Sequence, residues 1–486
     1  MDEFTFMVWY FISFWIFDLL YQYYISLKYG ERKNALYFFL SFSTFILNLI
    51  HTFFRFVWVI PYPHPVALFV AGFLSFLQRR NRKFVFLKSS FRKNFLSVLP
   101  AMEILFFVGM LIASWAYSGV LLAMIQTGIL FLQPDYFLPS LAIVAAIAAM
   151  VSGSSWTTAG TLGVALMGVA EVISFPQTMA AGAIVSGCYF GDKLSPLSDT
   201  TNLASSLTHV PIWTHIRHML KTTCISFGVA IFGFYVLNMF VWDSKQIADL
   251  SLQSGSFLSG ANHRISWMKF IPVVLVFGSS IFKLHIRLSL LLGIVSAIGF
   301  SFSELGFQLS IGKTLVYGFE SHSSNEVLDR FLSGGGVIAI LPTEILILAA
   351  VWFGAVVEGY GYLNEILIHI KNWAKDRWDI LLSTMGTSFL LNLITADQYL
   401  SLVIPARAFR SLAEEKGIPE KDISRSLEDS GTISSPLIPW NSCGAFMSTS
   451  LGVSVLSFFP FVFFNLFHII LSVSLLLIAK NKSKSS

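Results

Sequence analysis

Carboxylates stand at points where the sequence is otherwise apolar enough to lie inside a membrane. The segment GDKLSPLSDTTNLASS (191–206) directly follows an apolar stretch and places Asp192 and Asp199 among hydroxyl and amide side chains. Asp397 lies between two apolar stretches in NLITADQYL (392–400). A carboxylate at membrane depth costs several kcal/mol unless a cation or a proton matches its charge. These acids therefore predict sites where a hard cation such as Na⁺ and a proton can bind.

Helix-breaking and small residues accompany these acids. Pro196 interrupts the first segment, and SGSSWTTAGTLG (152–163) consists almost entirely of Gly, Ser, Thr and Ala. Irregular backbone at membrane depth occurs only where it is buried in protein or lines a cavity, and its carbonyls and hydroxyls can bind a cation. Ordinary packing of small residues or capping of the next helix by Asp199 are the simpler alternatives. The residues predicted to bind the cation and the proton are Asp199, Asp397, Asp192, Thr157, Ser154, Ser195, Thr200, Asn202, Asn441 and Glu358.

Other ionisable residues are assigned structural roles. Glu103 and Glu344 each follow a proline, and we expect them in the first turn of a helix, where the helix dipole favours an acid. His209, His215 and His218 are not spaced as a metal site. We expect them at a cytoplasmic face, with a pH-sensing patch as the alternative.

The elements that hold these residues are predicted to be membrane helices. Hydrophobic residues make up 55% of the 486 residues and charged residues 12%, whereas soluble domains carry about 25% charged residues. The sequence predicts an all-α polytopic membrane protein with roughly 11 or 12 transmembrane helices, several of them broken or re-entrant. A net charge of +5 is too small and scattered for a nucleic-acid surface. Three cysteines in apolar context predict no disulfide framework.

The second half of the sequence repeats motifs of the first. A shift of 240 residues aligns GDKLSPL (191–197) with GTISSPL (431–437), and it pairs Asp397 with Thr157. Equivalent loops differ in charge character, which favours an inverted-topology repeat, typical of secondary transporters, over chance matches in apolar sequence. The predicted regions are N-terminal membrane helices (1–95), a first transport repeat (96–245), a connecting region (246–334) and a second transport repeat (335–480).

Charged segments predict the orientation in the membrane. Residues 78–93 carry seven Lys or Arg and no acid, and the tail ends with Lys480, Lys482 and Lys484, so both are expected in the cytoplasm. The acid-rich segment 313–330 is expected outside. The N-terminal apolar stretch lacks a preceding basic residue and a cleavage site, and we interpret it as a first spanning helix.

The motifs together resemble the NhaC family of bacterial Na⁺/H⁺ antiporters. They are GSSWTTAGTLGVALMGVA, AGAIVSGCYFGDKLSPLSDTTNLA, THIRHML, TADQYL and LEDSGTISSPLIPWNSCGA, which span about 97–240 and 335–460. The Phe-rich first 95 residues match poorly, and PARAF departs from the usual pattern. The resemblance implies sodium–proton exchange at the bacterial inner membrane, while the family also includes proteins similar to malate/lactate exchangers and amino-acid carriers.

Three functions are therefore compared. The first is a secondary transporter that exchanges Na⁺ (or Li⁺) for H⁺ through buried carboxylates shared by both ions. The second is an ion-coupled carrier of organic anions or amino acids, in which Lys193, or Trp440 with Asn441, would bind the substrate carboxylate. The third is an intramembrane aspartyl protease, disfavoured because its GxGD pattern is absent. We expect no cofactor, no enzymatic activity and no nucleic-acid partner; the partners are Na⁺, H⁺ and lipid, and a homo-oligomer is compatible with the sequence.

Overall fold

The computed structural model describes residues 84–241, 266–305, 310–321, 329 and 332–485, which all lie in one compact unit, residues 68–486. These residues are almost entirely helical, and within them the one β-type contact is an isolated bridge between Phe319 and Gly334. The predicted first spanning helix and most of the predicted N-terminal region lie outside the described residues.

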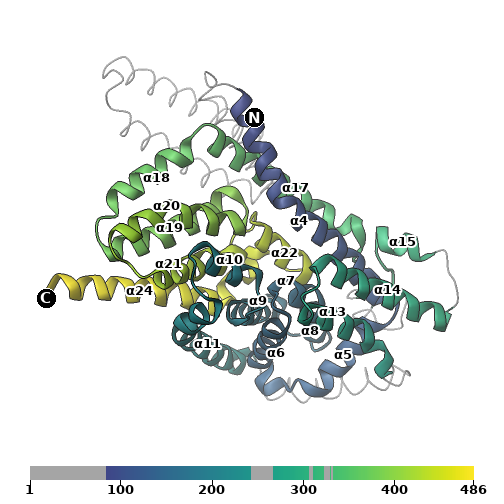
Figure 1. Ribbon diagram of the computed structural model, residues 1–486. Helices are drawn as coiled ribbons and strands as arrows, with labels where there is room; N and C mark the ends of the chain where they lie inside the picture. Colours follow the sequence, from purple (N-terminus) through teal and green to yellow (C-terminus); the bar gives the residue numbers. More distant parts are fainter. Residues whose placement is uncertain (1–83, 242–265, 306–309, 322–328, 330–331, 486) are drawn as a thin grey trace, which may run out of the picture. The chain divides into compact units, whose positions relative to one another are not determined.

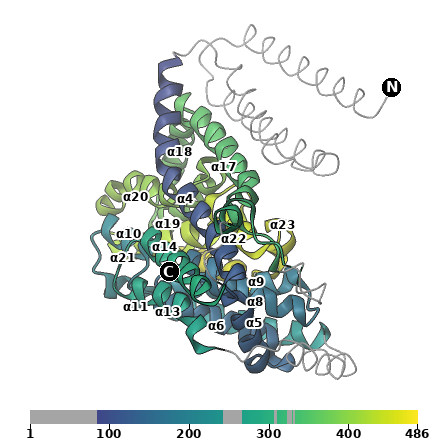
Figure 2. The same ribbon diagram turned by 90° about the vertical axis from the view of Figure 1, so that its right-hand side faces the viewer.

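Long and very short helices alternate along the chain (Figures 1 and 2). The first half contains α4 (Phe84–Tyr117), α5 (Val120–Phe131), η2 (Pro134–Tyr136), α6 (Phe137–Ser152), α7 (Ser155–Thr158), η3 (Ala159–Gly163), α8 (Val164–Val172), α9 (Gln177–Leu194), α10 (Asp199–Leu207) and α11 (Ile212–Val241). The connecting region contains η4 (Trp267–Phe270), α13 (Ile271–Ile281), α14 (Ile286–Leu305) and α15 (Ser310–Tyr317). The second half contains α17 (Gly336–Gly359), α18 (Tyr362–Trp373), α19 (Arg377–Thr395), α20 (Gln398–Glu415), α21 (Glu420–Leu427), η5 (Glu428–Thr432), η6 (Ser435–Leu437), α22 (Ser442–Leu451), α23 (Val455–Phe458), η7 (Phe459–Phe461) and α24 (Phe463–Ser485).

Five of the described helices are long and apolar enough to cross a membrane. They are Leu87–Tyr117, Pro134–Ser152, Ile212–Val241, Gly336–Gly359 and Phe463–Lys482. The pair Ser442–Leu451 and Val455–Phe461 counts as a sixth span only if it is taken together, because it bends by 85° at its break. The protein is thus an all-α polytopic membrane protein with broken helices, as predicted. The predicted total of crossings also includes segments outside the described residues.

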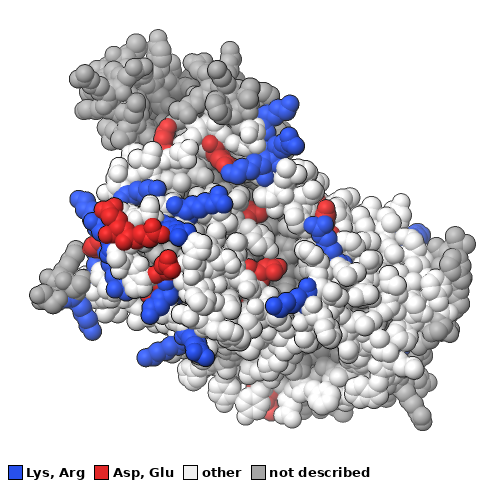
Figure 3. Space-filling model, in the orientation of Figure 1, with Lys and Arg blue, Asp and Glu red and all other residues white. Residues whose placement is uncertain are grey.

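Charged side chains are unevenly distributed over the surface. Figure 3 shows them gathered over α18 to α21, near the start of α4 and near the end of α24, while the surface over α5 and α6 is nearly uncharged. Residues 84–93, predicted as part of a basic loop, are instead the first turns of α4. With 34 residues, α4 is about 51 Å long, which exceeds a hydrocarbon core of about 30 Å. Its basic first turns can therefore extend into water.

The two halves repeat the same order of helices with the same local geometry at their joints. Gly119 before α5 and Gly361 before α18 both adopt left-handed backbone, with φ of 73° and 80°. The side chains of Ser198 and Asn441 cap α10 and α22. These pairs are 361 − 119 = 242 and 441 − 198 = 243 residues apart. The structural offset is therefore slightly longer than the 240 residues that aligned the sequence motifs.

Helices α4 and α17, which are equivalent in the two halves, pack side by side in opposite directions (Figures 1 and 2). Lys93 of α4 forms an ion pair with Glu358 of α17, and further along α4 Gly109 packs against Ile340. The residue numbers rise along one helix as they fall along the other.

Helices α11 and α24 form a second equivalent pair with the same antiparallel arrangement. Ser226 contacts His468, and Phe234 stacks on Phe463 with ring centroids 4.8 Å apart. A twofold axis along the membrane normal would keep equivalent helices parallel, whereas an axis in the membrane plane makes them antiparallel. The packing of both pairs therefore supports the inverted repeat that the sequence predicted.

Candidate ion-binding site

The breaks after α6 and α19 place polar groups at equivalent points in the two halves. Gly153 (φ 68°) and Ala396 (φ 57°) each turn the chain through left-handed backbone. Ser154 Oγ then accepts a hydrogen bond from the first turn of α7 at 3.1 Å, and Asp397 Oδ1 accepts one from the first turn of α20 at 2.8 Å. Asp397 therefore corresponds to Ser154, and the sequence-based pairing with Thr157 was wrong. Left-handed backbone is strained for alanine by about 1–3 kcal/mol and is common at functional sites.

Asp192 reaches the start of α7 from the neighbouring helix α9. Its Oδ2 accepts hydrogen bonds from Ser155 Oγ at 2.7 Å and Ser155 N at 3.2 Å. Each half thus holds a carboxylate at the N-terminus of its broken helix, Asp192 at α7 and Asp397 at α20. Only 6% and 2% of these side chains are exposed. The partial positive charge of a helix N-terminus stabilises a carboxylate without replacing a full counter-ion.

Neither of these two carboxylates forms an ion pair with a described residue. Their hydrogen-bond donors are hydroxyl and backbone N–H groups. A buried carboxylate that lacks a cationic side chain nearby needs either a proton or a bound cation to balance its charge. This is the electrostatic condition for a site that alternates between H⁺ and Na⁺.

Asp199 stands on the solvent-accessible side of the same region. It is the first residue of α10, whose N-terminus is capped by Ser198, and it is exposed. Asp199 is close enough to Asp192 for their charges to interact, and Tyr399 interacts with Asp192, Asp199 and Asp397. The structure therefore brings the three predicted aspartates together around Tyr399, with two of them buried.

Glu428 is a third buried carboxylate, which sequence reasoning did not assign. It lies in the π-helical turn η5 and is fully buried. Thr200 Oγ1 donates a hydrogen bond to its Oε1 at 3.3 Å, while its Oε2 has no hydrogen-bond partner among the described residues. Both Asp192 and Lys193 are close enough to interact with it electrostatically. Insertion of a π-helical turn is frequent at functional sites, but nothing in the local sequence marks one here.

The predicted hydroxyl and amide ligands divide into two groups. Thr157 Oγ1 is buried with no hydrogen-bond partner among the described residues, so it can offer an oxygen to a bound ion. Ser195, Asn202 and Asn441 instead hold irregular backbone in place. Ser195 Oγ donates to Met150 O at 2.8 Å, and Asn441 Oδ1 accepts from the start of α22. The amide of Asn202 donates to two carbonyls of its own loop.

Glu358 is not brought to this site. It lies where α17 ends and forms an ion pair with Lys93 at the start of α4. The expectation that Glu103 and Glu344 occupy first helical turns was also wrong, since both lie inside long helices. Glu103 pairs with Arg287 at 2.8 Å, whereas Glu344 is buried, and neither of its oxygens has a hydrogen-bond partner among the described residues.

The three histidines near residue 215 have separate partners. His209 contacts Arg410 at 2.7 Å, His215 contacts Ser424 Oγ at 2.8 Å, and His218 pairs with Asp422. Throughout the described ranges, no three or more His, Cys, Asp and Glu side chains are arranged to hold a metal ion. The cysteines Cys188, Cys224 and Cys443 are all free thiols.

Comparison with known proteins agrees with this geometry. A model of the Na⁺/H⁺ antiporter family matches residues 187–480, which contain Asp192, Asp199, Asp397 and Glu428. The chain belongs to the Na⁺/H⁺ antiporter family. It is 33% identical over 365 residues to the Na⁺/H⁺ antiporter NhaC of Bacillus subtilis, a match that covers 74% of this chain and 80% of that protein. The resemblance to NhaC antiporters seen in the sequence is thereby confirmed.

Other relatives in this antiporter family have different substrates in their names. The chain is 35% identical over 378 residues to the arginine/ornithine antiporter ArcD of Halobacterium salinarum, covering 77% of this chain and 78% of the relative. It is 32% identical over 410 residues to the malate-2H⁺/Na⁺-lactate antiporter of Bacillus subtilis, covering 82% and 86%. Membership of the family therefore establishes an antiporter fold and leaves the substrate to be argued from the site.

Proposed function

We propose that the protein is a secondary transporter, and not an enzyme, that exchanges Na⁺ or Li⁺ for H⁺ by alternating access. The observation that carries this proposal is the pair Asp192 and Asp397. Both are buried, and they occupy equivalent helix N-termini in the two halves without a basic partner among the described residues. Antiport then follows from competition, because protonation removes the negative charge that a bound Na⁺ requires.

The surrounding residues have distinct roles in this mechanism. Asp192 and Asp397 supply charge, and Thr157 Oγ1 supplies a neutral oxygen ligand. Glu428, close to Asp192, adds a carboxylate that can take up a proton or complete the cation site. Asp199, at the exposed side, attracts cations towards the buried pair. Carboxylate, hydroxyl and carbonyl oxygens are the ligands that hard cations prefer.

The contacts around the site disfavour transport of an organic anion. A substrate carboxylate needs a cation or hydrogen-bond donors, and the sequence offered Lys193, or Trp440 with Asn441. Lys193 Nζ lies 2.8 Å from Asp429 Oδ1, and Trp440 Nε1 donates to Leu393 O at 2.8 Å. The amide of Asn441 donates to an asparagine of α19. All three groups are already engaged within the protein.

The distribution of charge supports an orientation in the bacterial inner membrane with the C-terminus in the cytoplasm. Lys480 near the end of α24 pairs with Asp379 at the start of α19 and lies over the ring of Trp373, the last residue of α18. Lys93 lies at the other end of α18, beside Glu358. We therefore assign the basic start of α4 and the basic end of α24 to one face, which the positive-inside rule puts in the cytoplasm.

The decisive experiment measures dequenching of a ΔpH-sensitive dye in everted membrane vesicles that contain the protein. We expect Na⁺ or Li⁺ to collapse the pH gradient, and the double variant Asp192→Asn/Asp397→Asn to be inactive while still inserted. K⁺, malate, lactate and arginine are tested in the same vesicles. A response to malate, lactate or arginine without a response to Na⁺ or Li⁺ would contradict the proposed exchange.

A further inference from the structure

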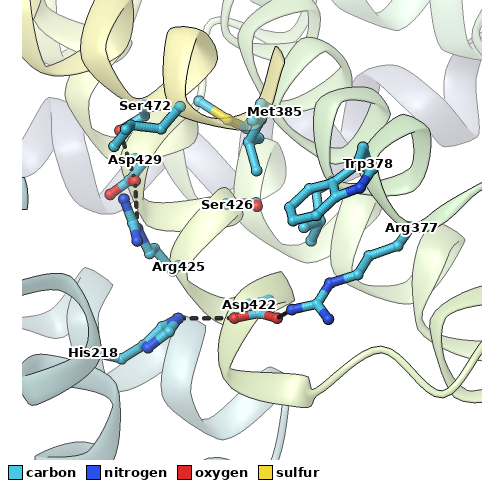
Figure 4. A pocket seen from close by; sticks show the side chains of 12 residues that line it. His218, Arg377, Trp378, Met385, Asp422, Arg425, Ser426, Asp429 and Ser472 are labelled. Carbon is cyan, nitrogen blue, oxygen red and sulfur yellow. Dashed lines mark hydrogen bonds and ion pairs between the residues drawn. The ribbon is translucent and has the colours of Figure 1, made fainter. Parts of the chain in front are cut away.

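A cavity of about 180 Å³ leads from the charged surface over α19 and α21 towards the core (Figure 4). At its outer end, Asp422 pairs with His218 at 2.8 Å and with Arg377 at 2.5 Å, and 46% of the Arg377 side chain is exposed. At its inner end, Asp429 contacts Arg425 and is almost fully buried. The cavity is large enough for several water molecules and so connects a buried carboxylate with the surface.

Asp429 is held by four side chains from three elements besides its own. Its Oδ1 lies 2.8 Å from Lys193 Nζ of α9 and 2.9 Å from His468 Nε2 of α24. Its Oδ2 lies 3.0 Å from Arg425 Nε of α21 and accepts a hydrogen bond from Ser472 Oγ of α24 at 2.8 Å. Two basic side chains thus contact this carboxylate, unlike those of the candidate ion-binding site.

His468 is positioned to carry a proton beside that carboxylate. A carboxylate only accepts hydrogen bonds, so Nε2 donates to Asp429 and Nδ1 accepts from Ser226 Oγ at 3.1 Å. Burial disfavours the charged imidazolium, Asp429 stabilises it, and Lys193 and Arg425 oppose its charge, so His468 can hold the added proton only briefly. Imidazole is the side chain whose charge changes most readily near neutral pH. His468 is fully buried, so its proton must travel through the protein.

This cluster adjoins the candidate ion-binding site through two pairs of neighbouring residues. Lys193 follows Asp192 at the end of α9, and Asp429 follows Glu428 in η5. Glu428 interacts electrostatically with both Lys193 and Asp192. A change of charge at the cluster therefore acts directly on the carboxylates that bind the transported ions.

The lining of the cavity suits a proton better than a sodium ion. Its arginines and acids balance, since Arg377 pairs with Asp422 and Arg425 pairs with Asp429. Neither acid therefore offers Na⁺ an unpaired charge in exchange for its hydration shell. A proton can still pass, because it moves between water, imidazole and carboxyl groups without a hydrated ion crossing the passage.

We propose that Asp429, His468 and Lys193 form a proton route between the cavity and the buried carboxylates, separate from the route that Na⁺ takes. The inference rests on the proposed Na⁺/H⁺ exchange and deepens it. In this arrangement Asp429 takes a proton from the water of the cavity and shares it with His468 through their hydrogen bond. Lys193, in contact with Asp429, gives a proton to Glu428 and regains one from Asp429. The cavity supplies water on the face assigned to the cytoplasm.

The test compares two transport modes of the purified full-length protein in lipid vesicles. One assay follows Na⁺-driven pH change, and the other follows exchange of radioactive sodium for unlabelled sodium at equal pH on both sides. We expect His468→Gln to slow the first by about a hundredfold, the lower range for loss of a positioned proton-transfer group, and to leave the second within about twofold of wild type. His369→Gln, at an exposed histidine of α18, is the matched control and should preserve both modes.

A second variant guards against a defect of folding. Lys193→Met/Asp429→Leu removes both charges of the pair at similar volume, an exchange that buried ion pairs often tolerate, and it should show the same split between the two modes. If either variant exchanged Na⁺ for H⁺ at the wild-type rate, or lost both modes equally, the separate route would be refuted. Wild-type protein inactive in both assays would instead refute the proposed Na⁺/H⁺ exchange, and the route with it.

Discussion

At the scale of single residues, the position of each carboxylate relative to a helix end decides its role. Asp192 and Asp199 are seven residues apart in one polar segment, yet the first is buried in the last turn of α9 and the second is exposed at the start of α10. Asp397 combines two functions, because it caps α20 and carries a buried charge. The three aspartates should therefore respond differently to neutralisation.

The first prediction concerns these aspartates. Asp192→Asn and Asp397→Asn should each abolish Na⁺/H⁺ exchange, because the amide neither balances a cation nor carries the transported proton. Asp199→Asn should mainly raise the sodium Michaelis constant, since an exposed acid attracts ions and its interactions are screened by water. Initial rates across a sodium titration in everted vesicles separate the two effects. If Asp199→Asn alone abolished exchange, Asp199 and not the buried pair would be the essential carboxylate.

The second prediction uses the buried hydroxyl of Thr157. Removing a buried hydroxyl that has no hydrogen-bond partner is neutral or stabilising for the fold, so Thr157→Val should not lower the melting temperature in detergent. If Oγ1 is a sodium ligand, the same change should weaken apparent sodium affinity by about tenfold, the loss of roughly one charge-assisted contact. If the sodium affinity were unchanged, Thr157 would only pack between helices and would not be a sodium ligand.

Sequence reasoning found the aspartates and Thr157, included Glu428 and Asp429 only within the motif LEDSGTISSPLIPWNSCGA without assigning them a role, and overlooked His468. The aspartates can be found from the sequence because they interrupt apolar stretches. A charged residue is costly there, so its presence indicates a function. Glu428 and Asp429 follow a charged segment, so sequence alone does not distinguish them from a solvated helix end. His468 sits alone in an apolar helix, where a core histidine is the simpler interpretation. Only the fold shows that these groups converge.

At the scale of elements, close packing of small residues positions the site. Gly187 and Gly191 of α9 face α6, and a Cβ atom at either would lie 2.1 Å from a carbonyl oxygen of that helix, Ala142 O or Ala146 O. This contact brings the end of α9, with Asp192, against the break between α6 and α7. The small-residue packing common in membrane helices thus sets the position of a charge.

The third prediction tests this contact. Gly187→Ala should destabilise the protein by about 1–3 kcal/mol, the usual cost of overpacking a core, and should reduce exchange through displacement of Asp192. Gly386→Ala is the matched control, because a Cβ atom there meets nothing within 4 Å, and the gain in helix propensity is up to about 1 kcal/mol. Thermal unfolding of both variants in the same detergent makes the comparison. If the Gly187→Ala and Gly386→Ala variants melted at the same temperature, α6 and α9 could move apart around the added methyl group without loss of stability.

The helices themselves were largely predictable, and their ends were less so. Apolar runs identify the spans, but the basic residues 84–93 were predicted as a loop because charge is rare inside a membrane helix. In the structure they are helical and form the first turns of α4. The spacing Pro176–Pro196 is 20 residues, whereas Pro419–Pro436 is 17, so the equivalent helix is shorter in the second half. Because of this difference in length, the offset between the halves changes along the chain. The single shift of 240 residues therefore paired Asp397 with the wrong residue of the first half.

At the scale of the whole described unit, the antiparallel packing of equivalent helices determines which segments share a face. The 24 residues of α17 span about 36 Å, enough to cross the hydrocarbon core. Lys93 lies beside its C-terminal end, and Phe319 bridges to Gly334, just before its N-terminal end. The basic start of α4 and the segment around Glu320 should therefore face opposite sides.

The fourth prediction tests this topology by cysteine labelling. In a Cys224→Ser background, which removes the one exposed native thiol, Lys88→Cys and Lys482→Cys should react with an impermeant maleimide only from the cytoplasmic side. Glu320→Cys should react only from outside. Reaction of positions 88 and 320 from the same side would exclude the inverted arrangement.

The fifth prediction concerns pH. If protons and sodium share the buried carboxylates, lowering the pH should raise the apparent sodium Michaelis constant, because a protonated acid offers no charge to the dehydrated cation. The triple variant His209→Gln/His215→Gln/His218→Gln should keep this competition and shift the pH profile only modestly. A sodium affinity that does not change with pH would rule out a shared site.

The unequal origin of the two buried aspartates bears on the ancestry of the molecule. Duplication of one gene yields two identical halves, yet Asp397 comes from the cap of α20, where the first half has Ser154. Asp192 comes from α9, where motif alignment places Thr432 in the second half. The two acids therefore stand on non-equivalent elements of the two halves. The variant Ser154→Asp/Asp192→Thr would give the first half the arrangement of the second, and retained exchange would show that a charge at the helix N-terminus matters more than the helix that supplies it.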